Sequence, residues 1–131
     1  MKVVVVGESG FTRSSINVNL RSDGYSVTEV DPICLFDVLA VMREVEPHLV
    51  VVDHDMPSCN CETLIRIIRE DPVLATTPVL LIVPCPGSEE TERILNWDRV
   101  RIMEKPLQVE ALLQEVQHHF TGFTSHQACF R

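Results

Sequence analysis

The chain has 131 residues, 45% of them hydrophobic and 23% charged, and its formal net charge is −8. This length and composition predict one globular domain with a buried core. The acidic balance argues against a nucleic-acid-binding surface, because clustered lysine and arginine side chains hold a phosphate backbone, and no apolar run reaches the ~18 residues of a membrane span.

Five short apolar runs predict β-strands along the chain. Three of them are continuous and rich in valine, a pattern typical of strands that are buried on both faces of a parallel sheet. The two other runs have a weaker pattern. In chain order the predicted strands are Val3–Val6, Tyr25–Val30, Leu49–Val52, Val79–Val83 and Val100–Met103.

Apolar residues at helical spacing lie between and after these runs and predict helices. Asn60 and Ser88 are predicted N-caps, and Gly24, Pro47 and Pro72 mark helix ends. The apolar stripes are Leu35, Leu39 and Met42, then Leu64, Ile67 and Ile68, then Val109, Leu112, Leu113, Val116 and Phe120. The alternation predicts five βα units, which form an α/β fold with a doubly wound five-stranded parallel sheet.

The stripe from Leu35 to Met42 is unusually apolar, because Phe36, Val38 and Val41 lie within it. A helix of this kind either buries more than one face or offers a surface to a partner. Both interpretations stay open from the sequence.

Several polar residues follow the ends of predicted strands. Gly7 and Glu8 follow the first strand, Asp53 the third and Lys105 the fifth, while Val83 ends the fourth. Ligands of open parallel sheets bind outside the carboxyl ends of the strands, so these residues are expected to meet at one edge. Mg²⁺ accepts carboxylate ligands, and a lysine ammonium suits a phosphoryl oxygen. The sequence therefore indicates a site for a hard cation and a phosphoryl group.

The turn after the first strand offers a competing interpretation, a phosphate-binding P-loop. That motif needs a second glycine five residues after the first, followed by a lysine. Counting from Gly7, these positions hold Thr12 and Arg13, although Ser14 fits the motif. A strand–turn–helix junction is therefore favoured over a nucleotide-binding protein.

Two longer motifs carry a resemblance to a known family. The stretch LVVVDHDMP, residues 49–57, and the stretch MEKP, residues 103–106, resemble the receiver domain of two-component response regulators. The resemblance implies a flavodoxin-like fold in which Asp53 is the phosphoacceptor and Lys105, before a cis-proline, contacts the phosphoryl group. It covers residues 2 to about 120, so residues 1–121 are expected to form the receiver domain and 122–131 a C-terminal tail.

The chain departs from the family pattern at several positions. The family has two acids after the first strand, where this chain has Gly7 and Glu8. Its switch residues, a strand-4 hydroxyl and a strand-5 aromatic, are here Val83 and Ile102, and Cys61 replaces a glycine. These substitutions predict weaker metal binding, slower phosphorylation and a small conformational response.

The expected metal is Mg²⁺, bound weakly. Its ligands would be Glu8, Asp53 and the backbone carbonyl of Asp55, since oxygen ligands suit this cation. In the competing structural interpretation, Asp53 is a strand-end carboxylate that pairs with Lys105 and does no chemistry.

The functional expectation is a non-enzymatic receiver that is phosphorylated on Asp53 and signals through protein contacts. A histidine kinase or phosphotransfer protein would be the donor, with a downstream protein as the target and neither nucleic acid nor membrane as a partner. A homodimer is left open. The alternative is a pseudo-receiver, an interaction module that is never phosphorylated.

The cysteines bear on the compartment and on a further site. Five cysteines at irregular spacing suit a reducing compartment, and the N-terminal apolar run is too short for a signal peptide, so a cytoplasmic location is expected. Cys59, Cys61 and Cys85 could form a soft metal or redox site. Unrelated small loop residues are the favoured interpretation, because no fourth ligand is evident.

Overall fold

Five parallel strands form the central sheet, in the order β2-β1-β3-β4-β5. The computed structural model describes residues 1–57, 59–84, 93–94, 97 and 99–121. The strands are β1 (Lys2–Val6), β2 (Ser26–Val30), β3 (Leu49–Asp53), β4 (Val79–Val83) and β5 (Val100–Glu104). The helices are α1 (Gly10–Ser22), α2 (Leu35–Val45), α3 (Cys61–Glu70) and α5 (Val109–Thr121). The predicted doubly wound parallel sheet is confirmed.

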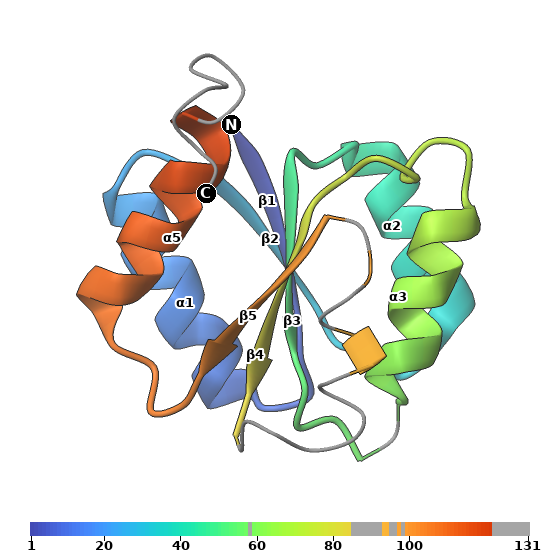
Figure 1. Ribbon diagram of the computed structural model, residues 1–131, viewed down its shortest axis with the longest axis horizontal. Coiled ribbons are helices and arrows are strands. Elements are labelled where there is room, and N and C mark those ends of the chain that lie inside the picture. Colours follow the sequence, from blue (N-terminus) through green and yellow to red (C-terminus); the bar gives the residue numbers. More distant parts are fainter. Residues whose placement is uncertain (58, 85–92, 95–96, 98, 122–131) are drawn as a thin grey trace.

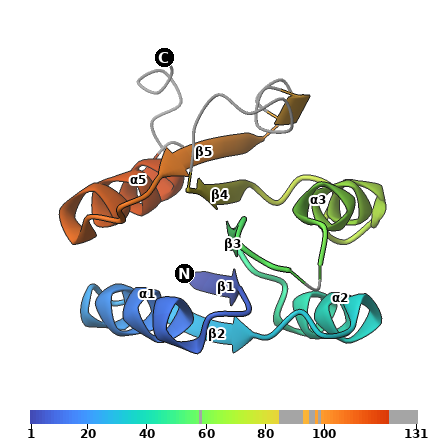
Figure 2. The ribbon, with the colours of Figure 1, turned by 90° about the horizontal axis from the view of Figure 1, so that it is seen from below.

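The helices cover both faces of the sheet. Figures 1 and 2 show α1 and α5 against one face and α2 and α3 against the other. Most of the helix predicted between β4 and β5 lies outside the described residues, as do its predicted cap Ser88, Cys85 and the predicted tail 122–131. Among the described residues, no helix is both long and apolar enough to cross a membrane.

Two apolar cores flank the sheet, and successive strand residues alternate between them. Val4 and Val6 of β1 pack toward α2 and α3, whereas Val3 and Val5 pack toward α1 and α5. All four are essentially fully buried. The valine runs are continuous because both faces of the pleated sheet are covered.

The helices bury most of the predicted stripes, with several differences. α2 buries Val38 and Met42, whereas the predicted Leu35 and Leu39 are only half-buried, as is Leu113 of α5. α3 buries Ile65 completely, whereas the predicted Ile67 is only half-buried. Val109 begins α5 and is 43% exposed. Asn60 caps α3 as predicted, since its Oδ1 accepts a hydrogen bond of 3.1 Å from the N–H of Thr63.

α2 and α3 are joined at their C-terminal ends by an ion pair. Arg43 of α2 donates from Nε to Asp71 Oδ2 at 2.5 Å, and Asp71 Oδ1 accepts from the N–H groups of Val73 and Leu74. The hydrogen bond from Arg43 is the main cause that lowers the pKa of Asp71, and burial opposes it. Asp71 follows the last residue of α3 and closes that helix end.

The lowered pKa of Asp71 predicts an acid-sensitive fold. A carboxyl whose pKa is lower in the folded state than its ordinary 3.8 stabilises the fold above that pH, and this contribution is lost as the pH falls through the folded-state pKa. The slope of the unfolding free energy against pH measures how many more protons the unfolded state binds than the folded state. Below pH 3.8 this number should be smaller in Asp71→Asn than in wild type, by up to about one proton. Urea unfolding at several acidic pH values measures this slope, and equal slopes in both proteins would contradict the assignment.

Candidate functional site

Asp53 is the centre of the candidate site. It ends β3 at the carboxyl edge of the sheet and its side chain is 2% exposed. Lys105 Nζ lies 3.0 Å from Asp53 Oδ1, and the N–H of Asp55 donates to the same oxygen at 3.1 Å. Asp53 Oδ2 is also buried, and among the described residues it has no hydrogen-bond partner. One oxygen is therefore held in place and the other is left for a ligand.

The strand order brings Lys105 to Asp53. β4 lies between β3 and β5, and the N–H of Lys105 donates to the carbonyl of Val83 at 2.9 Å, which fixes the start of the following loop. The peptide bond from Lys105 to Pro106 is cis, as the family resemblance implies. The predicted meeting of Asp53 and Lys105 at one edge is thus present in the structure.

Gly7 lies directly beside Asp53. A Cβ atom added at Gly7 would lie 3.2 Å from Asp53 Cβ and 3.9 Å from Asp53 Oδ2. The N–H of Gly7 donates to the carbonyl of Val30, so the chain is still paired with β2 at this point. The acid that this chain lacks would therefore have faced Asp53.

Glu8 is the remaining acid at this corner and is half-buried. Its charge acts on Cys59 in the loop after β3. The pKa of the Cys59 thiol is raised mainly by burial and secondly by the Glu8 carboxylate. Cys61 is buried at the start of α3. Among the described residues, no group of three or more histidine, cysteine, aspartate or glutamate side chains is placed to hold a metal, so the structure brings together no soft metal site from Cys59 and Cys61.

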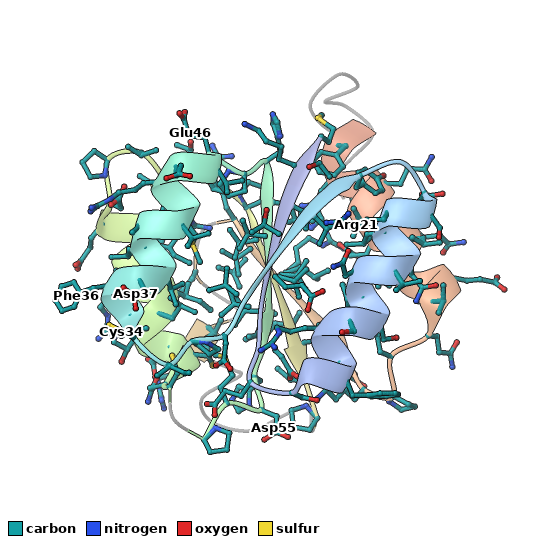
Figure 3. All side chains as sticks on the ribbon, turned by 180° about the vertical axis from the view of Figure 1, so that it is seen from behind. Arg21, Cys34, Phe36, Asp37, Glu46 and Asp55 are labelled. Carbon is teal, nitrogen blue, oxygen red and sulfur yellow. The ribbon has the colours of Figure 1, made fainter. Side chains whose placement is uncertain are left out.

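The residues present fit a weakly held Mg²⁺. The unpartnered, buried Asp53 Oδ2 is an oxygen that a cation would satisfy, and Glu8 follows β1 at the same edge. Asp55, whose backbone carbonyl is the third predicted ligand, is labelled in Figure 3 at this edge of the sheet. Two carboxylates and one carbonyl are few ligands for an all-protein site, but Mg²⁺ usually keeps several waters.

Arg13 is a neighbour of the site that the sequence analysis treated only as a failed P-loop lysine. Its Nη1 donates to the carbonyl of Gly7, Nε lies 3.5 Å from Glu29 Oε1, and Nη1 lies 3.7 Å from Asp31 Oδ2. Arg13 Cγ would lie 3.5 Å from a Cβ atom at Gly7. Glu29 in β2 and Asp31 directly after it were the available sequence signal for the two ion pairs of Arg13, but not for its contact with Gly7.

The two switch positions hold apolar side chains. Val83 is fully buried in the core next to α2 and α3, and Ile102 of β5 packs against that same core while remaining half-buried. Neither side chain can donate a hydrogen bond. The site therefore contains the Asp53–Lys105 pair without a hydroxyl from position 83.

Comparisons with known proteins agree with this geometry. The family model for the response regulator receiver domain matches residues 3–117. Among curated proteins, Protein PilG of Pseudomonas aeruginosa is 28% identical over 127 residues, which are 95% of this chain and 90% of PilG. This relative is similar to the chain over nearly the whole length of both proteins.

Solved structures show the same fold. The chemotaxis response regulator CheY4 of Vibrio cholerae has a TM-score of 0.79 and 21% identity, over 90% of this chain and 97% of that one. The signal receiver domain of a signal transduction histidine kinase from Syntrophus aciditrophicus has a TM-score of 0.81 and 20% identity, over 99% of this chain and 97% of that one. Together with the match over residues 3–117, these likenesses show that the chain belongs to the family of response regulator receiver domains of two-component signalling.

Proposed function

We propose that Asp53 accepts a phosphoryl group from a histidine kinase or phosphotransfer protein, and that the chain then signals through protein contacts in the cytoplasm. The observation that carries this proposal is the asymmetry of the Asp53 carboxylate. Oδ1 is fixed by Lys105 and by the N–H of Asp55, whereas the buried Oδ2 has no hydrogen-bond partner among the described residues. Such a carboxylate has one oxygen available as a nucleophile.

The transfer needs attack by one oxygen and neutralisation of charge. Asp53 Oδ2 would bond to phosphorus while the bond from phosphorus to the donor breaks, and the electron pair of that bond would stay with the donor. Lys105 would turn from the carboxylate toward the incoming phosphoryl oxygens, as a point charge placed 3.0 Å from Oδ1 can do. A bound Mg²⁺ would supply further charge neutralisation, held by Glu8, Asp53 and the carbonyl of Asp55.

A groove beside Lys105 is suited to contact with the donor protein. It has a volume of about 240 Å³ and lies between α1 and the segment that follows β5. Phe11, which is 86% exposed, and Val109, which is 43% exposed, contribute to its lining. A donor that covers this groove would bring its phosphorylated side chain to the edge where Asp53 and Lys105 lie.

A pseudo-receiver is the second candidate function, and two observations favour it. Gly7 removes an acid from beside Asp53, and the buried Val83 offers no hydroxyl. In this alternative the Asp53–Lys105 ion pair only holds two strands together, and partners bind without phosphorylation.

Phosphorylation separates the two functions. Incubation with acetyl phosphate and Mg²⁺, followed by intact-mass measurement, should show one added phosphoryl group. Asp53→Asn should abolish the addition because its amide is not a nucleophile of this kind, whereas Asp55→Asn should retain it because Asp55 contributes only its backbone to the site. An unmodified wild-type chain at saturating donor, with beryllofluoride also failing to bind, would favour the pseudo-receiver.

A further inference from the structure

The loop between β2 and α2 and the first turn of α2 expose two large apolar side chains. Ile33 is 81% exposed and Phe36 is 83% exposed; among the described large hydrophobic residues, only Phe11 is more exposed. Figure 3 shows Phe36 at the start of α2, pointing away from the ribbon, with Cys34 and Asp37 nearby. We name residues 31–37 the β2–α2 corner. Exposed apolar side chains that lie close together mark interaction surfaces more often than single ones do.

The sequence around the β2–α2 corner is acidic. The two charged residues of the corner are the acids Asp31 and Asp37, and of these Asp31 is also paired with Arg13 at 3.7 Å. Asp37 is exposed, and the side chain of Asp31 is 43% exposed. Like charges repel across an interface, so a second copy of the chain would place acid against acid here, whereas a basic partner would find complementary charge.

The corner is also linked to the phosphoacceptor. Asp31 pairs with Arg13 at 3.7 Å, and the same Arg13 nitrogen donates to the carbonyl of Gly7, whose Cα neighbours Asp53. A partner that neutralised Asp31 would therefore act on a residue that holds the backbone beside Asp53. The corner thus combines apolar anchors, complementary charge and a physical connection to the site.

We propose that the β2–α2 corner is a docking surface for a protein segment whose apolar side chains are flanked by lysine and arginine. Ile33 and Phe36 would be the apolar anchors, and Asp31 and Asp37 would pair with the basic flanks. The proposal names a partner for the signalling function proposed above, but binding at the corner requires no phosphorylation. It therefore remains testable in Asp53→Asn.

The test uses the full chain and a synthetic amphipathic helix of leucine and lysine as the probe. A peptide of the same composition in scrambled order keeps the charge and loses the apolar face. We expect amide NMR shifts centred on residues 31–37, and an affinity that falls about tenfold in Phe36→Ser and in Ile33→Ser, because interface anchors dominate binding. Phe11→Ser, which removes an equally exposed phenylalanine from α1, should leave the affinity unchanged.

Four results would overturn the proposal. The first two are a scrambled peptide that binds as tightly as the amphipathic one, and NMR shifts centred on the groove near Phe11. The third is a peptide affinity of Phe36→Ser equal to that of wild type. The fourth is self-association of the wild-type chain in sedimentation that Phe36→Ser abolishes. Thermal unfolding of each serine variant checks that the fold is intact, as expected at exposed positions. Equal binding by Asp53→Asn and wild type would support the docking surface whether or not Asp53 is phosphorylated.

Discussion

Gly7→Asp should raise the affinity for Mg²⁺ by about tenfold, which corresponds to about 1.4 kcal/mol. The structure gives the reason, because a Cβ atom at this position would lie 3.9 Å from the unpartnered Asp53 Oδ2. The new carboxylate would face the same ligand space as Asp53 and Glu8, and affinity for hard cations rises with the number of charged oxygen ligands. Titration with Mg²⁺, followed by NMR or calorimetry, measures the change.

The same substitution should lower stability when no metal is present. The 3.2 Å approach of the added Cβ to Asp53 Cβ is tight, and Arg13 Cγ at 3.5 Å leaves little room for relief on the other side. A second carboxylate would also repel the buried Asp53. The melting temperature of Gly7→Asp should therefore fall in EDTA and rise more than that of wild type when Mg²⁺ is added.

Two control variants separate charge from size in this experiment. Gly7→Ala introduces only the tight Cβ contact, and Gly7→Asn adds an uncharged side chain of aspartate size. Both should be destabilised without any tenfold gain in Mg²⁺ affinity. If Gly7→Asn bound Mg²⁺ as tightly as Gly7→Asp, the charge at position 7 would have no part in metal binding.

The sheet and its two cores follow from the sequence because both faces are covered. The three continuous runs of valine, leucine and isoleucine are nearly the observed β1, β3 and β4, since such segments have few other stable positions. The weaker runs also lie within one residue of β2 and β5 at each end, and these two edge strands are partly exposed. The helices are less determined by the pattern. α3 carries apolar residues at 64, 65, 67 and 68, and only packing against the sheet decides that Ile65 is buried and Ile67 half-buried.

The candidate site was predictable in part for similar reasons. Asp53 ends β3 and Lys105 follows β5, and both strands are adjacent to β4, so the topology of a parallel sheet is sufficient to bring the two residues together. The contact from Arg13 to Gly7 was not predictable, because it depends on the direction of a long side chain in the first turns of α1. The spacing of residues in the sequence does not tell which way a long side chain points toward a neighbouring loop.

Val83→Thr should strengthen the response to beryllofluoride, the phosphoryl mimic, and should cost stability in its absence. Val83 is fully buried in an apolar core. A threonine there has nearly the shape of valine, but its hydroxyl would lack a partner until an anion binds, and an unsatisfied buried hydroxyl costs about 1–3 kcal/mol. A hydrogen bond to the charged mimic would recover about 1.5–3 kcal/mol, which corresponds to one to two decades of affinity.

The conformational response should change with the affinity. A ligand shifts a two-state equilibrium only by its different affinities for the two states, so wild type, which lacks this bond, should show small amide shifts over residues 84–104 on adding beryllofluoride. Val83→Thr should show larger ones. Val50→Thr, at an equally buried position in β3, is the matched control and should lose stability without gaining affinity.

Large shifts in wild type that Val83→Thr does not alter would mean that the signal leaves Asp53 by another path. The contacts from Gly7 through Arg13 to Asp31 would then be the first to test.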